Sequence, residues 1–311
     1  MPSRRRIALA FALVYIFWGS TFLGIRFAVT TLPPLLMAGA RFIAAGIILY
    51  AWSLRRGAPP PTAAQWGGAA LIGGLLFLGG NGALSWAVQW VPSGVASLLA
   101  ATGAFWIVLL DWAQPEGRRP TRRIVLGLVL GLAGVAVLIG PARLAGSGPV
   151  YAGAALVVTA GSFAWAAGSV LSRRVPLPAS SVQAAAMEML AGGVLLSGLG
   201  LALGERQKLV WASTSSTSIL AVLYLIVFGS LVGFTAYNWL LGVTSSARVS
   251  TYAYVNPVIA VFLGWAVGRE ELTLRTLLAA AVIVAAVALI ISDRSRRITN
   301  SETPLPKIEA P

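Results

Sequence analysis

Two residues of opposite charge, Arg41 and Glu188, lie within long apolar segments of this sequence. A charged side chain at membrane depth is costly, so it usually has a partner or a function. Both are candidates for gating or coupling, Glu188 by taking up a proton, and structural pairing with neighbours is the alternative. The chain has no His and no Cys, which excludes disulfides, thiol catalysis, Cys/His metal sites and histidine proton relays.

Aromatic and small polar side chains form the second group of candidates. Trp18 and Trp165 lie in the middle of apolar segments, where interfacial anchoring is a weak explanation, and paired rings would suit an amphipathic or aromatic solute. Ser250, Tyr254 and Pro257 recur at helical spacing and so share one face, and Pro257 leaves a backbone carbonyl without its helical donor. Further substrate-binding candidates, for which packing between helices is the alternative, are Asn81, Ser85, Ser97, Tyr237 and Asn238.

The composition is that of a membrane protein. Of the 311 residues, 58% are hydrophobic and only 10% are charged, whereas a soluble domain has about 25% charged residues. The net charge of +14 would suggest nucleic acid for a soluble protein, but these cations lie between apolar runs. We therefore expect a lipid bilayer and a small-molecule substrate as partners, with no nucleic acid and no cofactor.

The elements that must position the candidates are ten apolar segments, each close to the 20 residues that cross a bilayer. Most of the 23 Lys and Arg residues lie on one side if the N-terminus is inside, as the positive-inside rule predicts. This predicts an all-α integral membrane protein with both termini in the cytoplasm. A polar tail at 293–311 is predicted to be disordered. The predicted spans are 7–29, 35–54, 66–90, 93–112, 122–140, 150–172, 181–203, 216–240, 247–268 and 275–292.

The sequence contains an internal repeat. A shift of 147 residues places Arg41 on Glu188, and shifts of 147 or 153 residues place three tryptophans on three others, Trp18 on Trp165, Trp86 on Trp239 and Trp112 on Trp265. Each half, 7–140 and 150–292, holds five predicted spans, so the second half enters the membrane the other way up. Such inverted repeats are typical of transporters, because two related halves can rock about a central site.

Several motifs resemble the repeat unit of a known family. The order Phe17-Trp18-Gly-Ser-Thr-Phe22, Pro33-Pro34, Arg41-Phe42, and later Tyr254-Val-Asn-Pro257 through Trp265 and Gly268-Arg-Glu270 is similar to two EamA-type units of the drug/metabolite transporter superfamily. The resemblance implies ten helices, with helices 1, 3, 4, 6, 8 and 9 lining a central cavity and helices 5 and 10 peripheral. It also implies export of amino acids or related metabolites from the bacterial inner membrane, as by exporters of the YddG type. The first half departs from the pattern, since Ala104 stands where the second half has Pro257.

These observations predict a secondary transporter that exports neutral or aromatic amino acids, or related metabolites, by alternating access. A multidrug or other metabolite carrier of the same fold is one alternative, and a channel or membrane scaffold is another. An enzyme is not expected, because the sequence offers no nucleophile with a base and no metal cluster. Gly127 and Gly131 form a small-xxx-small pair on a peripheral span, which suggests either a homodimer contact or packing within the chain.

Overall fold

The computed structural model describes residues 3–114, 120–139, 148–244, 249, 251–269 and 271–300, and within these ranges it contains helices and connecting turns but no strand. The first half holds α1 (Arg4–Ala28), α2 (Pro34–Arg55), α3 (Ala63–Gly73), η1 (Gly74–Gly82), α4 (Ala83–Ala87), α5 (Ser93–Ala100), α6 (Gly103–Trp112) and α7 (Arg122–Ile139). The second half holds α9 (Gly148–Leu171), α10 (Ser181–Ala202), α11 (Glu205–Lys208), η2 (Trp211–Ser213), α12 (Ser216–Tyr224), η3 (Leu225–Phe234), α13 (Thr235–Val243), α15 (Tyr252–Ala266) and α16 (Leu274–Asn300).

Seven helical stretches in the described part of the chain are long and apolar enough to cross a membrane, and they coincide with predicted spans 1–4 and 6–8. The other three predicted spans fall on α7, α15 and α16. The helix α16 continues through Asn300, which lies within the segment 293–311 that was predicted to be a disordered tail. Nothing between 287 and 300 interrupts the helix, since this stretch has neither Pro nor Gly.

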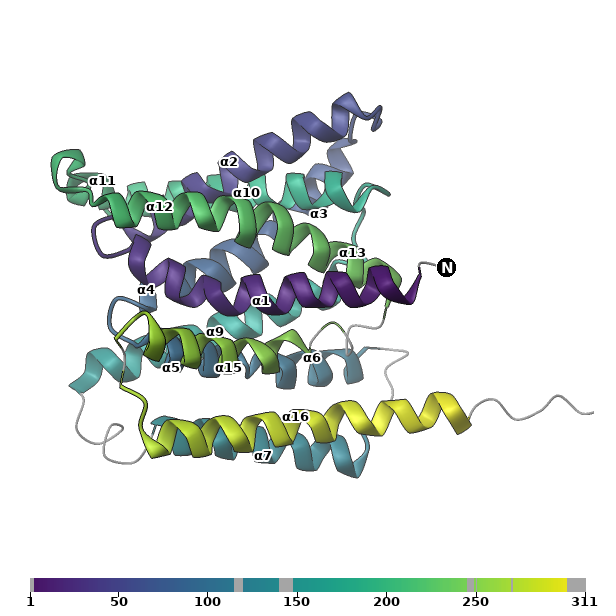
Figure 1. Cartoon of the computed structure of the whole chain (residues 1–311). Helices are drawn as coiled ribbons and strands as arrows, with labels where there is room; N and C mark the ends of the chain where they lie inside the picture. Colours follow the sequence, from purple (N-terminus) through teal and green to yellow (C-terminus); the bar gives the residue numbers. More distant parts are fainter. Residues whose placement is uncertain are drawn as a thin grey trace, which may run out of the picture.

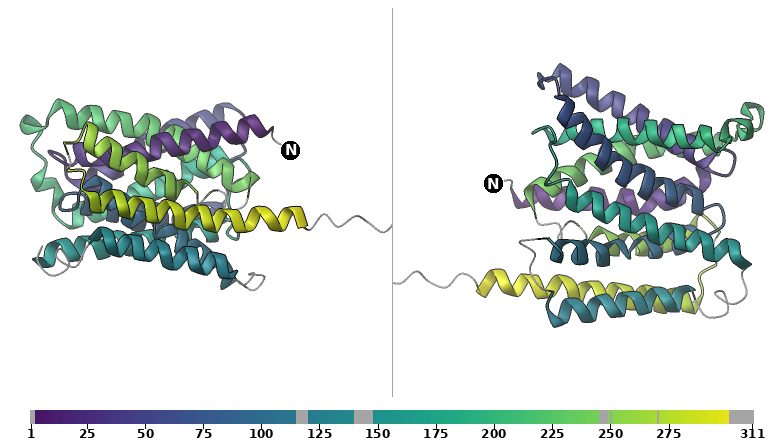
Figure 2. Two further views of the ribbon diagram at one scale, coloured as in Figure 1. Left: turned by 60° about the horizontal axis from the view of Figure 1, so that its bottom comes forward. Right: turned by 180° about the vertical axis from the view of Figure 1, so that it is seen from behind.

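The helices α7 and α16 pack against each other at one edge of the molecule (Figures 1 and 2), as the family resemblance implies for helices 5 and 10. Gly127 is buried, and a Cβ added at Gly131 would lie 3.7 Å from Ala286 Cβ of α16. This small-residue face therefore packs within the chain, and the homodimer stays a prediction. The start of α1 and the end of α16 lie on the same side (Figures 1 and 2), as an even number of crossings requires.

The central helices α2 and α10 touch through glycines that are equivalent in the predicted repeat. A Cβ added at Gly193 would lie 2.8 Å from Ile43 Cγ1, and one added at Gly46 would lie 2.8 Å from Leu190 Cγ. The same shift of 147 residues relates Gly46 to Gly193 and Ile43 to Leu190. The two contacts are thus copies of each other across the α2–α10 interface, the arrangement that a pseudo-two-fold axis between these helices produces.

Both halves contain a π-helix, η1 in the third predicted span and η3 in the eighth, at overlapping positions of the repeat. π-Helices are rare and frequently occur at functional sites. Each one presents a glycine to the mid-span tryptophan of the other half: Gly80 faces Trp165, and Gly233 faces Trp18. A Cβ added at either glycine would lie within 2.9 Å of the indole, so only glycine lets the rings approach this closely.

The start of α2 is capped from the second half of the chain. Pro33 at the N-cap offers no side-chain acceptor, although Pro34 suits the first helical position because it has no N–H to satisfy. The Glu205 carboxylate of α11 instead accepts hydrogen bonds from the backbone N–H groups of Leu35 and Leu36, at 2.9–3.2 Å. A negative charge at this end also complements the helix dipole. Glu205 of α11 therefore ties the second half of the chain to the start of α2.

Replacing Glu205 with alanine should lower the free energy of unfolding by about 1.5–3 kcal/mol, the range for a hydrogen bond to a charged group. The backbone donors of Leu35 and Leu36 would lose the carboxylate that accepts from them in this buried site. Thermal denaturation of the detergent-solubilised protein measures the effect. Gln207→Ala, at an exposed position of the same short helix, is the control and should leave the melting temperature unchanged. An equal loss in both variants would contradict the capping role.

Candidate functional site

A cavity of about 110 Å³ lies where the two halves meet. It is lined by residues of α1, α2, η1, α4, α5, α6, α9, η3 and α15, which are predicted spans 1–4, 6, 8 and 9. The resemblance implies all of these except span 2. An engineered cavity of about 150 Å³ holds benzene, so the cavity in this state is smaller than that and would have to widen to admit an amino acid.

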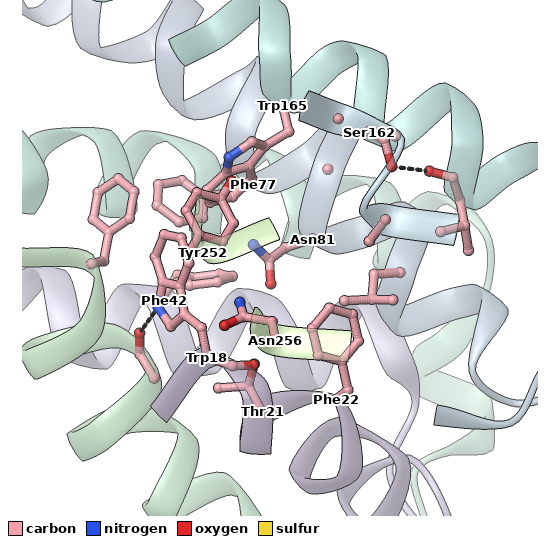
Figure 3. Close-up of a pocket in the computed structure, with 18 of the residues that line it drawn as sticks. Trp18, Thr21, Phe22, Phe42, Phe77, Asn81, Ser162, Trp165, Tyr252 and Asn256 are labelled. Atoms are coloured by element: carbon pink, nitrogen blue, oxygen red, sulfur yellow. Dashed lines mark hydrogen bonds between the residues drawn. The ribbon is translucent and has the colours of Figure 1, made fainter. Parts of the chain in front are cut away.

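The wall of the cavity combines aromatic side chains with small apolar residues and a few polar groups. Figure 3 shows the side-chain amides of Asn81 and Asn256 near each other, with Trp18, Phe77 and Tyr252 to one side. Few polar groups on an apolar wall are the usual design of small-molecule sites, where the polar groups fix orientation. Among the described residues, no cluster of His, Cys, Asp or Glu could hold a metal ion.

Trp18 and Trp165 meet edge to face, with ring centroids 5.5 Å apart and an interplanar angle of 84°. Tyr237 and Tyr252 pack against both the Trp18 ring and each other, with centroids 4.8–5.6 Å apart. The bonding of the two tryptophans differs. Trp18 Nε1 donates to the Gly229 carbonyl at 3.0 Å, whereas Trp165 Nε1 is buried without a hydrogen-bond partner.

A second cavity, of about 570 Å³, lies beyond this aromatic layer. The order along α9 shows the separation: Trp165 lines the central cavity, Ser169 comes next, and Ser172 lines the second cavity. Between the two, Ser169 Oγ and the Tyr237 hydroxyl are hydrogen-bonded at 2.6 Å. Asn238, the residue after Tyr237, lines the second cavity. The aromatic rings with this hydrogen bond thus form a layer that separates the two cavities.

Arg41 and Glu188 are both buried and do not share a site. Arg41 lines the central cavity and its Nε donates to Ser230 Oγ at 2.9 Å. Glu188 lines neither of the two cavities described above. One of its carboxylate oxygens accepts from Asn238 Nδ2 at 3.1 Å, and the other, Oε1, has no hydrogen-bond partner. Asn238 therefore joins Glu188 to the wall of the second cavity.

The remaining predicted residues have varied placements. Ser85 is fully buried and its hydroxyl has no hydrogen-bond partner, and Ser97 is buried with its hydroxyl donating to the Gly94 carbonyl at 2.7 Å. Neither lines the central cavity. Ser250 and the side chain of Tyr254 lie outside the described residues. Pro257 is buried inside α15.

The fourth and ninth predicted spans differ in regularity. The structure breaks the fourth span between α5 and α6, at Ala101 and Thr102, close to Ala104. The second half keeps α15 continuous through Pro257. The break therefore lies in the span that lacks the proline. There the backbone forms hydrogen bonds between residues three apart, such as from the Thr102 N–H to the Leu99 carbonyl and from the Ala104 N–H to the Ala101 carbonyl.

Sequence reasoning missed the face of α15 that meets the cavity. That face carries Tyr252 and Asn256, four residues apart, and the predicted set did not include either of them. With its amide nitrogen turned to the backbone, Asn256 donates to the Tyr15 and Tyr252 carbonyls at 3.1 and 3.2 Å. An Asn directly before the span's proline was the available signal. Also missed were Thr21, Phe22, Phe42, Phe77 and Ser162.

Comparisons with known proteins agree with this architecture. The family model described as the EamA-like transporter family matches residues 5–140 and 152–292. The inner membrane transporter YedA of Escherichia coli (strain K12) is 42% identical over 278 residues, covering 89% of this chain and 88% of YedA. A probable amino-acid metabolite efflux pump of Salmonella typhimurium (strain LT2) is 29% identical over 281 residues, covering 88% and 90%.

A solved crystal structure is also similar, with a TM-score of 0.69, 26% sequence identity, and coverage of 95% of this chain and 99% of the solved one. Together these matches confirm the resemblance to the drug/metabolite transporter superfamily that the sequence motifs indicated. Both named relatives are transporters or efflux pumps, and neither is described as an enzyme.

Proposed function

Because the chain belongs to the EamA-like transporter family, we propose that it exports neutral amino acids, aromatic ones included, across a bacterial inner membrane. The observation that carries this proposal is the central cavity, with aromatic rings and two side-chain amides at the junction of the halves. The rings would hold the apolar side chain of the amino acid, and the amides would form hydrogen bonds with its polar backbone groups. An efflux pump described for amino-acid metabolites is among the relatives.

Alternating access is the mechanism that we propose for this export. The symmetric contacts between α2 and α10, and between each π-helix and a tryptophan, support two inverted units, 7–140 and 150–292, that can rock about the cavity. In the present arrangement, the aromatic layer separates the central cavity from the second cavity. Movement of this layer would join the two cavities and open a path toward the side that holds both described ends of the chain.

A substrate panel in proteoliposomes tests the proposal. Purified protein should transport radiolabelled leucine, phenylalanine or threonine with saturation and with acceleration by the same compound on the opposite side. Flux without saturation or acceleration would indicate a channel instead. Transport of larger apolar drugs but of no amino acid would favour a multidrug carrier, and absence of any flux would favour a scaffold. The assay is run with and without a pH gradient.

The pH gradient addresses the predicted coupling role of Glu188. Glu188→Gln keeps the shape of the side chain and its acceptor for the Asn238 amide, but it cannot take up and release a proton. We expect this variant to lose uptake driven by a pH gradient, by about 10-fold or more, while amino-acid exchange continues. Glu271→Gln, at an exposed loop position, should retain both activities. Unchanged gradient-driven uptake in Glu188→Gln would remove Glu188 from the coupling mechanism.

A further inference from the structure

A buried guanidinium group lies at the wall of the central cavity with one of its donors unpaired. The Arg41 side chain is 4% exposed. Its Nε donates to Ser230 Oγ, and its Cζ lies 4.4 Å from the centroid of the Phe42 ring. Its Nη1 is buried and has no hydrogen-bond partner. Arg keeps its charge in proteins, so a cationic donor is left unsatisfied within the membrane, which is costly.

The described residues around the cavity do not supply a compensating negative charge. None of the described side chains that line it is Asp or Glu. Glu188, the repeat equivalent of Arg41, does not line the cavity and accepts its hydrogen bond from Asn238. The ring of Phe42 attracts the guanidinium through a cation–π contact but carries no net charge. The charge that would balance Arg41 can therefore be carried by a solute in the cavity.

We propose that Arg41 is the anion subsite of the transport cavity and binds the carboxylate of the transported solute. The proposal rests on the transport function above and names the group that the solute must carry. The planar guanidinium matches the geometry of a carboxylate, and such charge-assisted bonds are stronger than neutral ones. One cation in an otherwise apolar and amide-lined wall suits a monocarboxylate with an apolar side chain. A single cation does not balance the charge of a polyanion, and it repels cationic drugs.

The adjoining contacts hold the guanidinium in place for this role. A Cβ added at Gly229 would lie 3.0 Å from Arg41 Nη2 and 2.9 Å from Thr21 Cγ2. The group therefore lies against the backbone of η3, with Ser230 fixing its Nε. Side chains fixed by packing and hydrogen bonds bind a ligand without a large loss of conformational entropy.

Three compounds with the same side chain test the proposal by transport in proteoliposomes: leucine, leucinamide, which lacks the carboxylate, and 3-methylbutylamine, which lacks the whole carboxyl group. The wild-type protein should prefer leucine by about 10- to 100-fold in apparent affinity, the range for a hydrogen bond to a charged group. Arg41→Gln should bring that ratio close to one. Arg41→Lys keeps the charge without the planar fork and should give an intermediate ratio. The ratio within one variant does not depend on how much of that variant folds.

Arg56→Gln is the matched control, because Arg56 is exposed at the end of the same helix and stacks on Trp52. It should keep the wild-type ratio. If the wild-type protein transports leucine and leucinamide equally well, the anion subsite is wrong while the transport function stands. An unchanged preference for leucine in Arg41→Gln would also overturn it.

A binding measurement separates the subsite from the proposed function. Tryptophan fluorescence of the protein in nanodiscs is titrated with 4-methylpentanoate, which is leucine without its amino group, and with 3-methylbutylamine. Binding of the carboxylate by the wild-type protein but not by Arg41→Gln supports the subsite even if no amino acid is transported. Failure of the wild-type protein to bind the carboxylate overturns the subsite, whatever the transport panel shows.

Discussion

Replacing Gly193 with leucine will lower the stability of the protein by at least about 3 kcal/mol, at the upper end of the range for overpacked sites. The side chain would have to enter the contact between α10 and α2, where an added Cβ lies 2.9 Å from the Ile43 amide nitrogen and 3.0 Å from the Gly39 carbonyl oxygen. Both are backbone atoms, so relief requires the two helices to separate. These helices are equivalent in the predicted repeat, and their separation should also abolish transport.

Gly198→Leu is the control for this substitution, because Gly198 lies on the same helix and nothing is within 4 Å of an added Cβ. Leucine is a better helix former than glycine, so this variant should be as stable as the wild type or slightly more so. The comparison is made by thermal unfolding in detergent and by the yield of monodisperse protein. Equal melting temperatures for the two variants would show that the α2–α10 contact does not depend on glycine.

Trp18→Ala has the second largest expected effect, a loss of about 3–5 kcal/mol of stability, as for other buried Trp-to-Ala changes. Trp18 is 8% exposed, packs against four aromatic rings and donates to the Gly229 carbonyl. Truncation enlarges the central cavity and removes part of the layer that separates it from the second cavity. Substrate flux should therefore lose saturation as well as rate.

Two further variants separate the contributions of the Trp18 ring and its N–H. Trp18→Phe keeps an aromatic ring but leaves the Gly229 carbonyl without this donor, so it should cost about 0.5–1.5 kcal/mol from the hydrogen bond, in addition to the effect of the smaller ring. Trp211→Ala, at a residue that is 74% exposed, should have little effect. Thermal unfolding and proteoliposome flux measure all three variants. A stable Trp18→Ala protein with normal saturation would exclude Trp18 from both packing and the barrier.

Sequence analysis predicted the positions of the helices because span length and charge bias act along the chain. It also related Trp18 to Trp165 through the repeat, and both line the cavity. It did not predict the π-helices, because the apolar pattern of a span does not distinguish π from α geometry. It could not choose the face of α15 either. Helical periodicity groups residues without saying which group meets the cavity, and the structure places Tyr252 and Asn256 there.

Trp18 and Trp165 occupy equivalent positions in the predicted repeat but differ in their hydrogen bonds, and this has a consequence for the energetics of switching. Trp18 Nε1 bonds to the Gly229 carbonyl, while Trp165 Nε1 has no partner. If the two halves exchanged conformations, Trp165 would gain the bond that Trp18 gives up, and the number of indole hydrogen bonds would be conserved. This contact would then favour neither conformation. The equilibrium between the two conformations would depend on the solute and on the groups that differ between the halves, chiefly Arg41 and Glu188.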